Sequence, residues 1–363
     1  MKRTLGIRIL LAILSLCARH LCIAQPMDRI TLSPDGTSFI TVSGKPFHPW
    51  GFNYDRDFKM RLLEDYWAAE WDTVVADFGE MRSLGANTVR IHLQFARFMT
   101  AADKPDEPAL AKLRKLLALA EREDLYLDIT GLACYRRADV PDWYADLDEH
   151  ARWAAQASFW SAIAAACSQS PAVFCYDLVN EPAVPSKPLA ARHWLIGDLG
   201  PFTYCQFLTL DPAGRAGDDI ARAWARQMIA AIRKHDPKRL VTLGMLPNTL
   251  RDSPKGSCGF DVDAIAKDLD FVAVHFYPES GKFERDLAWL KRFAVGKPLV
   301  VEETFPLGCK PGELGQFIDR ASAVNGWISF YWGRSPVELS ASKNVADAIT
   351  ADWLDTFQKH RPP

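Results

Sequence analysis

Two glutamates, Glu181 and Glu303, end strand-like segments and carry the side chains that acetal hydrolysis requires. Glu181 follows the apolar run in 175–182 (CYDLVNEP), and Glu303 closes 297–303 (KPLVVEE). Hydrolysis with retained configuration uses one carboxyl group to protonate the departing oxygen and a second, about 5 to 5.5 Å away, to attack the anomeric carbon. The pair therefore predicts an acid/base at Glu181 and a nucleophile at Glu303, provided that the fold brings them together.

Further polar and aromatic side chains stand at the ends of other strand-like segments. In a barrel of parallel strands the active site lies at the carboxyl ends of the strands, so residues in these positions face it. Asn53 and Asp55, after the first strand, could contact substrate hydroxyls or simply cap a loop. The other strand ends, with the loops just beyond them, supply Arg90, His92, Thr130, Asn180, His275, Tyr277 and Trp332. This gathering exceeds what packing requires.

The elements that must position these residues repeat one unit, a short apolar run followed by an amphipathic stretch with helical spacing. Such a repeat is typical of parallel βα units. Eight runs are present, at 48–53, 87–93, 125–131, 173–180, 240–245, 271–277, 299–303 and 327–332. The pattern predicts an α/β fold, a (β/α)8 TIM barrel.

Helices and an N-terminal hairpin complete this prediction. Helical spacing covers 71–84, 108–122, 149–166 and 218–234. Ahead of the barrel, two alternating runs flank the turn 33–36 (SPDG), which predicts an N-terminal β-hairpin over the base of the barrel. The segment 182–217, rich in Pro, Trp and Phe, interrupts the repeat after the fourth strand. It either shapes the active-site face or braces the barrel.

The first 24 residues have the features of a secretory signal. A basic start precedes the apolar run 9–16, and Ala24 precedes the expected cleavage site. That run is shorter than the roughly 20 residues of a membrane-spanning helix, and no later stretch is long and apolar enough to span. We expect residues 1–24 to be removed and 25–363 to form a single secreted or periplasmic domain, a size common for one barrel.

Composition argues against several classes of function. With 43 basic and 45 acidic residues the formal charge is −2, and neither sign forms long blocks, so no nucleic-acid partner is indicated. The six cysteines after residue 24 contain no CxxC pair, which argues against a zinc or redox motif. Export makes disulfides possible, but the sequence gives no pairing. No metal or organic cofactor is implied, and we expect a monomer with a carbohydrate substrate.

Three strand-end motifs resemble those of glycoside hydrolase family 5, a family of retaining glycosidases in clan A that includes endoglucanases and mannanases. The strongest is 179–182 (VNEP), followed by 274–278 (VHFYP) and 297–303 (KPLVVEE). Their order and spacing together are specific. The likeness extends from 51–53 (GFN) to Trp332, nearly the whole chain after the signal. It implies a (β/α)8 barrel and hydrolysis of β-glycosides.

The resemblance also implies a role for residues around the leaving group and the sugar ring. Glu181 would be the acid/base, and Asn180 would bind the 2-hydroxyl of the sugar. His275 would lie beside the acid/base. Trp332 would form the aromatic floor on which the sugar ring stacks.

For the nucleophile, the resemblance implies Glu303, supported by Arg90 and hydrogen-bonded by Tyr277. Adjacent Glu302 competes for this role, because successive strand residues point to opposite faces and only one can face the mouth. The family spacing favours Glu303. A positive neighbour keeps a nucleophile ionised, whereas Glu181 must stay protonated near neutral pH, so we expect the two environments to push the pKa values apart.

Departures from the family pattern leave the substrate open. Thr130 stands where family 5 endoglucanases commonly have a histidine, which weakens a cellulase assignment, and 304–306 (TFP) replaces the usual aromatic and glycine after the nucleophile. The segment 135–137 (YRR) is expected to be a solvated loop. Three aromatic residues could stack sugars in outer subsites or pack in the core: Trp143, Tyr144 and Trp194.

Together these features predict a secreted hydrolase that cleaves O-linked β-glycosidic bonds of glycosides, oligosaccharides or polysaccharides by double displacement. One alternative is an inactive carbohydrate-binding barrel, which needs stacking aromatics but not two carboxylates. Another is a transglycosylase, in which a sugar hydroxyl replaces water. The sugar, the linkage and endo or exo action stay open, although the long segment 182–217 could wall off one side of the cleft and favour chain ends.

Overall fold

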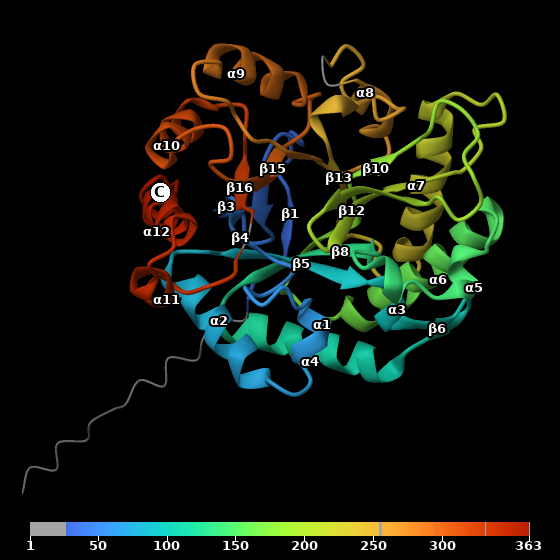
Figure 1. Ribbon diagram of the computed structural model, residues 1–363, viewed down its shortest axis with the longest axis horizontal. Helices are drawn as coiled ribbons and strands as arrows, with labels where there is room; N and C mark the ends of the chain where they lie inside the picture. Colours follow the sequence, from blue (N-terminus) through green and yellow to red (C-terminus); the bar gives the residue numbers. More distant parts are fainter. Residues whose placement is uncertain (1–26, 254–255, 331, 363) are drawn as a thin grey trace, which may run out of the picture.

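The computed structural model describes residues 27–253, 256–330 and 332–362 and contains a closed barrel of eight parallel strands (Figure 1). In chain order these are β4 (Trp50–Tyr54), β5 (Thr88–Gln94), β8 (Tyr126–Ala133), β9 (Val173–Asn180), β13 (Leu240–Met245), β14 (Val272–His275), β15 (Leu299–Thr304) and β16 (Gly326–Ser329). Pairing of β16 with β4 closes the ring. Each strand overlaps one predicted run, so the prediction of a (β/α)8 barrel is confirmed.

Helices surround the barrel and shield its apolar outer face (Figure 1). The longer ones are α2 (Trp71–Ser83), α4 (Glu107–Arg122), α6 (Glu149–Cys167), α7 (Gly217–Arg233), α9 (Phe283–Arg292), α10 (Pro311–Arg320) and α12 (Val345–Lys359). Shorter ones are α1 (Leu63–Tyr66), α3 (Phe95–Phe98), α5 (Asp142–Ala145), α8 (Val262–Ile265) and α11 (Pro336–Ala341). The four predicted helices are present as α2, α4, α6 and α7. Helix α4 begins where the Asp106 side chain accepts the N–H of Ala109, an ordinary N-cap.

A small antiparallel sheet closes the amino-terminal end of the barrel. Its strands are β1 (Ile30–Leu32), β2 (Phe39–Thr41) and β3 (Pro46–Phe47). The ring of Phe39 lies 5.2 Å from that of Phe174 and 5.1 Å from that of Phe271, measured between centroids, and both partners stand at the lower ends of barrel strands. The predicted hairpin is therefore present and covers the base.

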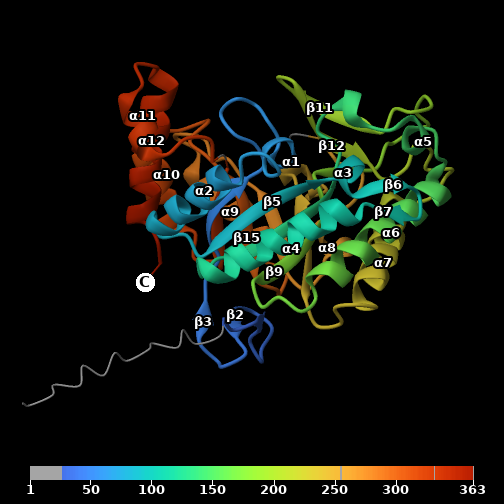
Figure 2. The same ribbon diagram turned by 90° about the horizontal axis from the view of Figure 1, so that it is seen from below.

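The segment between β9 and α7 forms a second small sheet at the opposite end of the barrel (Figure 2). It contains β10 (Pro182–Ala183), β11 (Leu195–Leu199) and β12 (Phe202–Phe207). Strand β12 pairs antiparallel with β11 and parallel with β10. The segment 182–217 thus lies over the carboxyl ends of the barrel strands. Another short antiparallel pair, β6 (Met99–Ala101) and β7 (Lys104–Pro105), follows α3.

Two further features that the sequence analysis considered are the N-terminal secretory signal and the pairing of the cysteines. The predicted signal, residues 1–24, lies outside the described residues, so its removal and export remain predictions. In the described part of the chain no helix is long and apolar enough to cross a membrane. The six cysteines found there are free thiols: Cys134, Cys167, Cys175, Cys205, Cys258 and Cys309.

Candidate active site

The side chains of Glu181 and Glu303 meet at the carboxyl ends of β9 and β15. Glu181 directly follows β9 in the left-handed backbone region, with φ of 49°, and its N–H donates to the carbonyl of Gly244 on neighbouring β13. One carboxylate oxygen of Glu181, one of Glu303 and one ring nitrogen of His275 all lie within 4.8 Å of one another. The side chains are mostly buried, with 13% and 7% of their surfaces exposed. Two distant positions in the sequence therefore form one acidic pair.

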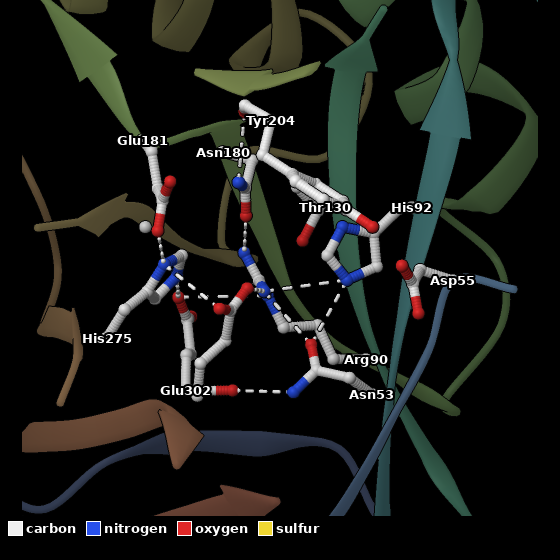
Figure 3. A network of polar contacts seen from close by, with 12 residues as sticks. Asn53, Asp55, Arg90, His92, Thr130, Asn180, Glu181, Tyr204, His275 and Glu302 are labelled. Atoms are coloured by element: carbon white, nitrogen blue, oxygen red, sulfur yellow. Dashed lines mark hydrogen bonds and ion pairs between the residues drawn. The ribbon is translucent and has the colours of Figure 1, made fainter. Parts of the chain in front are cut away.

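His275, the last residue of β14, lies between the two carboxylates. Its Nδ1 is 2.7 Å from Oε1 of Glu181 and 3.4 Å from Oε2 of Glu303. The ring is fully buried, and Figure 3 shows it directly below Glu181. Nδ1 donates to Glu181 when it carries the ring proton, and it accepts from Glu181 when that carboxyl group is protonated. The predicted position of His275 beside Glu181 agrees with this geometry.

Arg90, on β5, links the two halves of the site from below (Figure 3). Its Nη1 donates to Oε1 of Glu303 at 2.8 Å and to Oδ1 of Asn53 at 3.0 Å. Its Nη2 donates to Oδ2 of Asp177 at 2.7 Å and to Oδ1 of Asn180 at 3.0 Å. The side chain is fully buried, so these charge-assisted bonds act with little solvent screening. Arg90 is thus a positioning residue for the glutamate and the asparagine.

Tyr277 supplies a second donor to the same glutamate. Its hydroxyl donates to Oε2 of Glu303 at 2.9 Å, while Arg90 donates to the other oxygen. With one donor on each oxygen, the carboxylate is held in a single orientation. Both contacts match those that the family resemblance implies for a nucleophile.

Asn53 lies in the site, but all the hydrogen-bonding groups of its amide are already paired within the protein. Its Nδ2 donates to the carbonyls of Glu302 and Ser329 at 2.8 and 3.1 Å. Its Oδ1 accepts from Arg90 at 3.0 Å and lies 3.1 Å from Nε2 of His92. It is fully buried. Instead of contacting substrate hydroxyls, as expected for it, Asn53 joins β4 to β15 and β16 and orients the arginine.

Glu302 points away from the mouth into a buried acidic cluster. Its side chain is fully buried, and its Oε2 lies 3.8 Å from Nε of Arg90. Burial raises the pKa of Glu302 well above its usual value, and the charges of Asp128 and Asp177 raise it further. The protonated form of Glu302 is therefore favoured, beside Asp128, whose own pKa is raised by burial to about 6. A buried, protonated carboxyl group is poorly suited to attack a substrate.

The pKa values of the catalytic pair differ from the expected order. Burial raises the pKa of Glu181, but the hydrogen bond and charge of His275 outweigh it and hold the pKa below its usual value. For Glu303, burial outweighs the lowering by His275 and Arg90, so its pKa is raised. The reason is that His275 lies closer to Glu181. Cys205 and Arg90 also lower the pKa of Glu181, so the charge of His275 is one of several interactions that oppose burial.

Trp332 does not lie with the other predicted site residues. It is 3% exposed, its ring lies 5.5 Å from that of Phe52, and its side chain hydrogen-bonds Asp77 of α2. These contacts place it between the barrel and the helices, not beneath a sugar as expected. Phe330 lies near the site in its stead, with its ring centroid 6.4 Å from that of Tyr277.

Strand β12 adds two contacts that sequence reasoning missed. Sγ of Cys205 lies 2.9 Å from Oε2 of Glu181 and donates to it. The carbonyl of Tyr204 accepts a hydrogen bond from Nδ2 of Asn180 at 3.1 Å. The segment 202–207 (FTYCQF) contains three aromatic residues and a threonine, a strand signal that could have indicated β12. The long segment after β9 therefore contributes to the acid/base environment.

Aromatic residues in the loop after β8 and in the long segment pack in the interior. Tyr135, expected in a solvated loop, is 1% exposed, and its hydroxyl lies 2.5 Å from Nδ1 of His92. Tyr144 is fully buried and stacks on Phe95 with centroids 3.8 Å apart. Trp194 is 2% exposed. Tyr144 and Trp194 are therefore packing residues rather than exposed sugar platforms.

Comparisons with known proteins agree with this geometry. No curated protein matches the sequence. Three solved structures share the fold. An exo-β-1,4-mannosidase from Opitutaceae bacterium strain TAV5 has a TM-score of 0.67 at 17% identity, over 91% of this chain and 61% of that chain. A β-1,4-mannanase from Aplysia kurodai has a TM-score of 0.58 at 16% identity, over 90% and 96%. An endo-1,4-β-mannanase from Rhizomucor miehei has a TM-score of 0.60 at 18% identity, over 92% and 100%.

The sequence comparison gives the family. The family model Cellulase (glycosyl hydrolase family 5) matches residues 42–303. This range begins directly after β2, in the small sheet at the amino-terminal end of the barrel, and ends within β15. This range includes both glutamates and all the residues that hold them. The chain therefore belongs to glycosyl hydrolase family 5 and is a glycoside hydrolase.

Proposed function

We propose that the protein hydrolyses β-glycosides with retention of configuration, through a glycosyl-enzyme intermediate on Glu303. The observation that carries this proposal is the distance of at most 4.8 Å between oxygens of Glu181 and Glu303. Retaining enzymes have their carboxyl groups about 5 to 5.5 Å apart, whereas inverting enzymes leave roughly 6.5 to 9.5 Å for a water molecule. The short distance favours direct attack by a carboxylate.

In the first step, Glu181 donates its proton to the departing oxygen while Glu303 attacks the anomeric carbon. Arg90 and Tyr277 hold the attacking carboxylate, and the amide of Asn180, fixed by its two protein contacts, faces the sugar ring. In the second step, Glu181 removes a proton from water, which attacks the same carbon and frees Glu303. The sugar hemiacetal and the aglycone alcohol are the products.

We further propose β-mannosides as the first substrates to test, because the similar structures include β-1,4-mannanases and a β-1,4-mannosidase. A panel of aryl β-glycosides, with mannose, glucose and N-acetylglucosamine as the sugar, measures this directly. Activity on one sugar identifies the glycone. Failure on all of them and on β-1,4-linked polysaccharides, under conditions where the protein is folded by circular dichroism, would refute hydrolysis of β-glycosides.

The catalytic assignment is tested with three matched amide variants. Glu181→Gln and Glu303→Gln should each lower kcat/KM on an oligosaccharide by at least about 1,000-fold. Glu302→Gln is the control: an amide resembles the protonated carboxyl group in shape and donates a hydrogen bond, so activity should stay within about threefold of the unaltered enzyme. An inactive Glu302→Gln beside an active Glu303→Gln would assign the nucleophile to Glu302 instead.

Trapping separates the hydrolase from the two alternatives. A 2-fluoro glycoside with a good leaving group should label one residue, Glu303, as found by peptide mass spectrometry. An inactive carbohydrate-binding barrel would show no label. A transglycosylase would show the label but would release sugar mainly to added sugar acceptors rather than to water.

A further inference from the structure

The guanidinium group of Arg56 joins three elements that lie far apart in the sequence. Arg56 follows β4, and its Nη1 pairs with Oδ2 of Asp55 at 2.6 Å. The guanidinium carbon lies 5.7 Å from the ring of Phe202 and 5.9 Å from that of Tyr204, both on β12, and 5.3 Å from the ring of Phe330, after β16. Such distances are typical of cation–π contacts. We call Arg56, Phe202, Tyr204 and Phe330 the Arg56 bridge.

The Arg56 bridge connects to both catalytic glutamates. On one side Phe330 packs edge-on against Tyr277, whose hydroxyl donates to Glu303. On the other side Tyr204 accepts a hydrogen bond from Asn180, the residue before Glu181. Burial raises the pKa of Tyr204, and the charges of Asp55 and of both catalytic glutamates raise it further, which places this phenol close to all three carboxylates. The contacts therefore run from one glutamate to the other around one side of the site.

Barrel order shows which side the bridge occupies. Strand β4 lies closer in the barrel to Glu303 than to Glu181. Only β16 stands between β4 and β15, which carries Glu303, whereas both β5 and β8 stand between β4 and β9, which precedes Glu181. The aglycone leaves toward Glu181, because that residue protonates the departing oxygen. The sugar bound to Glu303 therefore has its far, non-reducing end directed toward β4. Any additional sugar unit on that end would have to pass Arg56.

Asp55 supplies a polar group at this closed end. It is 1% exposed, and its Oδ1 has no hydrogen-bond partner among the described residues. Figure 3 shows Asp55 beyond His92, on the side of the network opposite Glu181. A buried carboxylate oxygen without a partner is costly, and a sugar hydroxyl can satisfy it. Only the terminal unit of a chain has a free hydroxyl at the position where an internal unit carries the next glycosidic bond.

We propose that the Arg56 bridge closes the glycone side behind one sugar, so that the enzyme removes single units from non-reducing chain ends and cleaves short glycosides. Asp55 accepts a hydrogen bond from the free terminal hydroxyl, and Arg56 fixes the orientation of Asp55. This inference rests on the proposed function, since it assigns the glycone side from the roles of Glu181 and Glu303. It adds chain-end specificity and the residues that impose it.

The test uses two β-1,4-linked tetrasaccharides of mannose, or of the sugar that the aryl-glycoside panel selects. One has a free non-reducing end and the other carries a 4-O-methyl group there, and both are labelled with 2-aminobenzamide at the reducing end. The unaltered enzyme should release monosaccharide and labelled trisaccharide first, and it should cleave the blocked substrate at least about 100-fold more slowly. Labelled disaccharide as the first product, or equal rates on both substrates, would overturn the inference.

An Arg56→Ala variant tests the bridge itself. Removing the guanidinium opens the glycone side, so the rate on the blocked substrate relative to the free one should rise by at least about tenfold. Arg61→Ala is the matched control, because Arg61 lies nearby but pairs with Asp57 and Glu70 instead; its ratio should stay unchanged. An unchanged ratio in folded Arg56→Ala contradicts the role of the bridge.

The outcomes separate this inference from the proposed function. If the unaltered enzyme cleaves neither the aryl glycosides nor the free tetrasaccharide, the proposed function fails. If it cleaves aryl glycosides and also cuts the blocked tetrasaccharide at the central bond, the inference alone fails. Should Arg56→Ala not fold, the product pattern of the unaltered enzyme still decides, because it requires no variant.

Discussion

At the scale of single residues, the single charge on Arg90 explains why the carboxyl groups around it differ in protonation. Asp177 and Glu303 each accept a hydrogen bond from Arg90, whereas Glu302 lies at 3.8 Å from its Nε. One positive charge cannot neutralise three buried carboxylates, and an uncompensated buried charge costs several kcal/mol. The retained proton on Glu302 resolves this conflict. It leaves Arg90 to share its charge between Asp177 and the glutamate at the mouth.

The thiol of Cys205 is expected to tune the acid/base. Cys205→Val removes the hydrogen bond to Glu181, whereas Cys205→Ser keeps a donor. Because the thiol is among the interactions that lower the pKa of Glu181, the valine variant should raise it. Because a higher pKa leaves a larger fraction of Glu181 protonated near neutral pH, we expect kcat/KM to rise about 3- to 10-fold with alkyl glycosides, whose leaving groups need protonation, and to change little with dinitrophenyl glycosides.

Leaving-group dependence and pH profiles of kcat/KM for both variants measure this effect. The serine variant should resemble the unaltered enzyme. Equal losses on alkyl and dinitrophenyl glycosides would instead indicate that the valine disturbs the site as a whole.

At the scale of elements, the short helix α1 connects β4 to β5 through one buried acid. Oε1 of Glu64 accepts the backbone N–H of Gln94, at the end of β5, at 2.9 Å. Burial raises the pKa of Glu64 to about 7. The folded state therefore binds a proton that the unfolded chain releases near pH 4.5. This contribution to stability is complete below that pH and is lost as the pH rises toward 7.

Glu64→Gln should remove this pH dependence while its amide oxygen still accepts the N–H of Gln94. The variant and the unaltered protein should have similar free energies of unfolding at pH 4. At pH 8 the variant should be more stable by about 2 to 3 kcal/mol, since each pKa unit corresponds to about 1.36 kcal/mol. Urea unfolding at both pH values measures the difference. A constant difference across the pH range would show that Glu64 does not titrate in this window.

The elements also show how far the sequence could predict the structure. The eight barrel strands were predictable because apolar runs and amphipathic helices alternate along the chain. Trp332 was misplaced because β16 ends at Ser329, and beyond the strand end side chains no longer alternate between faces. Strands β11 and β12 were not predicted, although the aromatic and β-branched residues of 202–207 are a strand signal. Glu181 and Glu303 could be predicted, but their distance required the closed barrel.

At the scale of the whole molecule, the barrel is closed at its amino-terminal end by aromatic packing and carries its chemistry at the other end. Phe39 on β2 is 1% exposed and packs between Phe174 and Phe271. The sheet of β1, β2 and β3 lies at one end of the barrel, and the sheet of β10, β11 and β12 lies at the other (Figure 2), where Glu181 and Glu303 stand at the ends of β9 and β15. Stability and activity should therefore respond separately to changes at the two ends.

Phe39→Ala should lower the free energy of unfolding by about 3 to 5 kcal/mol, the usual range for removing a buried phenylalanine ring. The kcat per folded molecule should remain unchanged at a temperature where the variant is folded. Urea unfolding and activity at saturating substrate measure the two effects. Val42→Ala, at a 63% exposed position in the turn directly after β2, is the control and should change stability by less than about 0.5 kcal/mol.

A binding cavity sealed behind its innermost sugar has a single opening, and this dictates the sequence of product departure. The aglycone must diffuse away before the monosaccharide can follow it through the same entrance. Accumulated monosaccharide would then re-enter and compete with fresh substrate. The Arg56 bridge would therefore make the enzyme sensitive to feedback from its own sugar, so that its output slows wherever that sugar is not consumed.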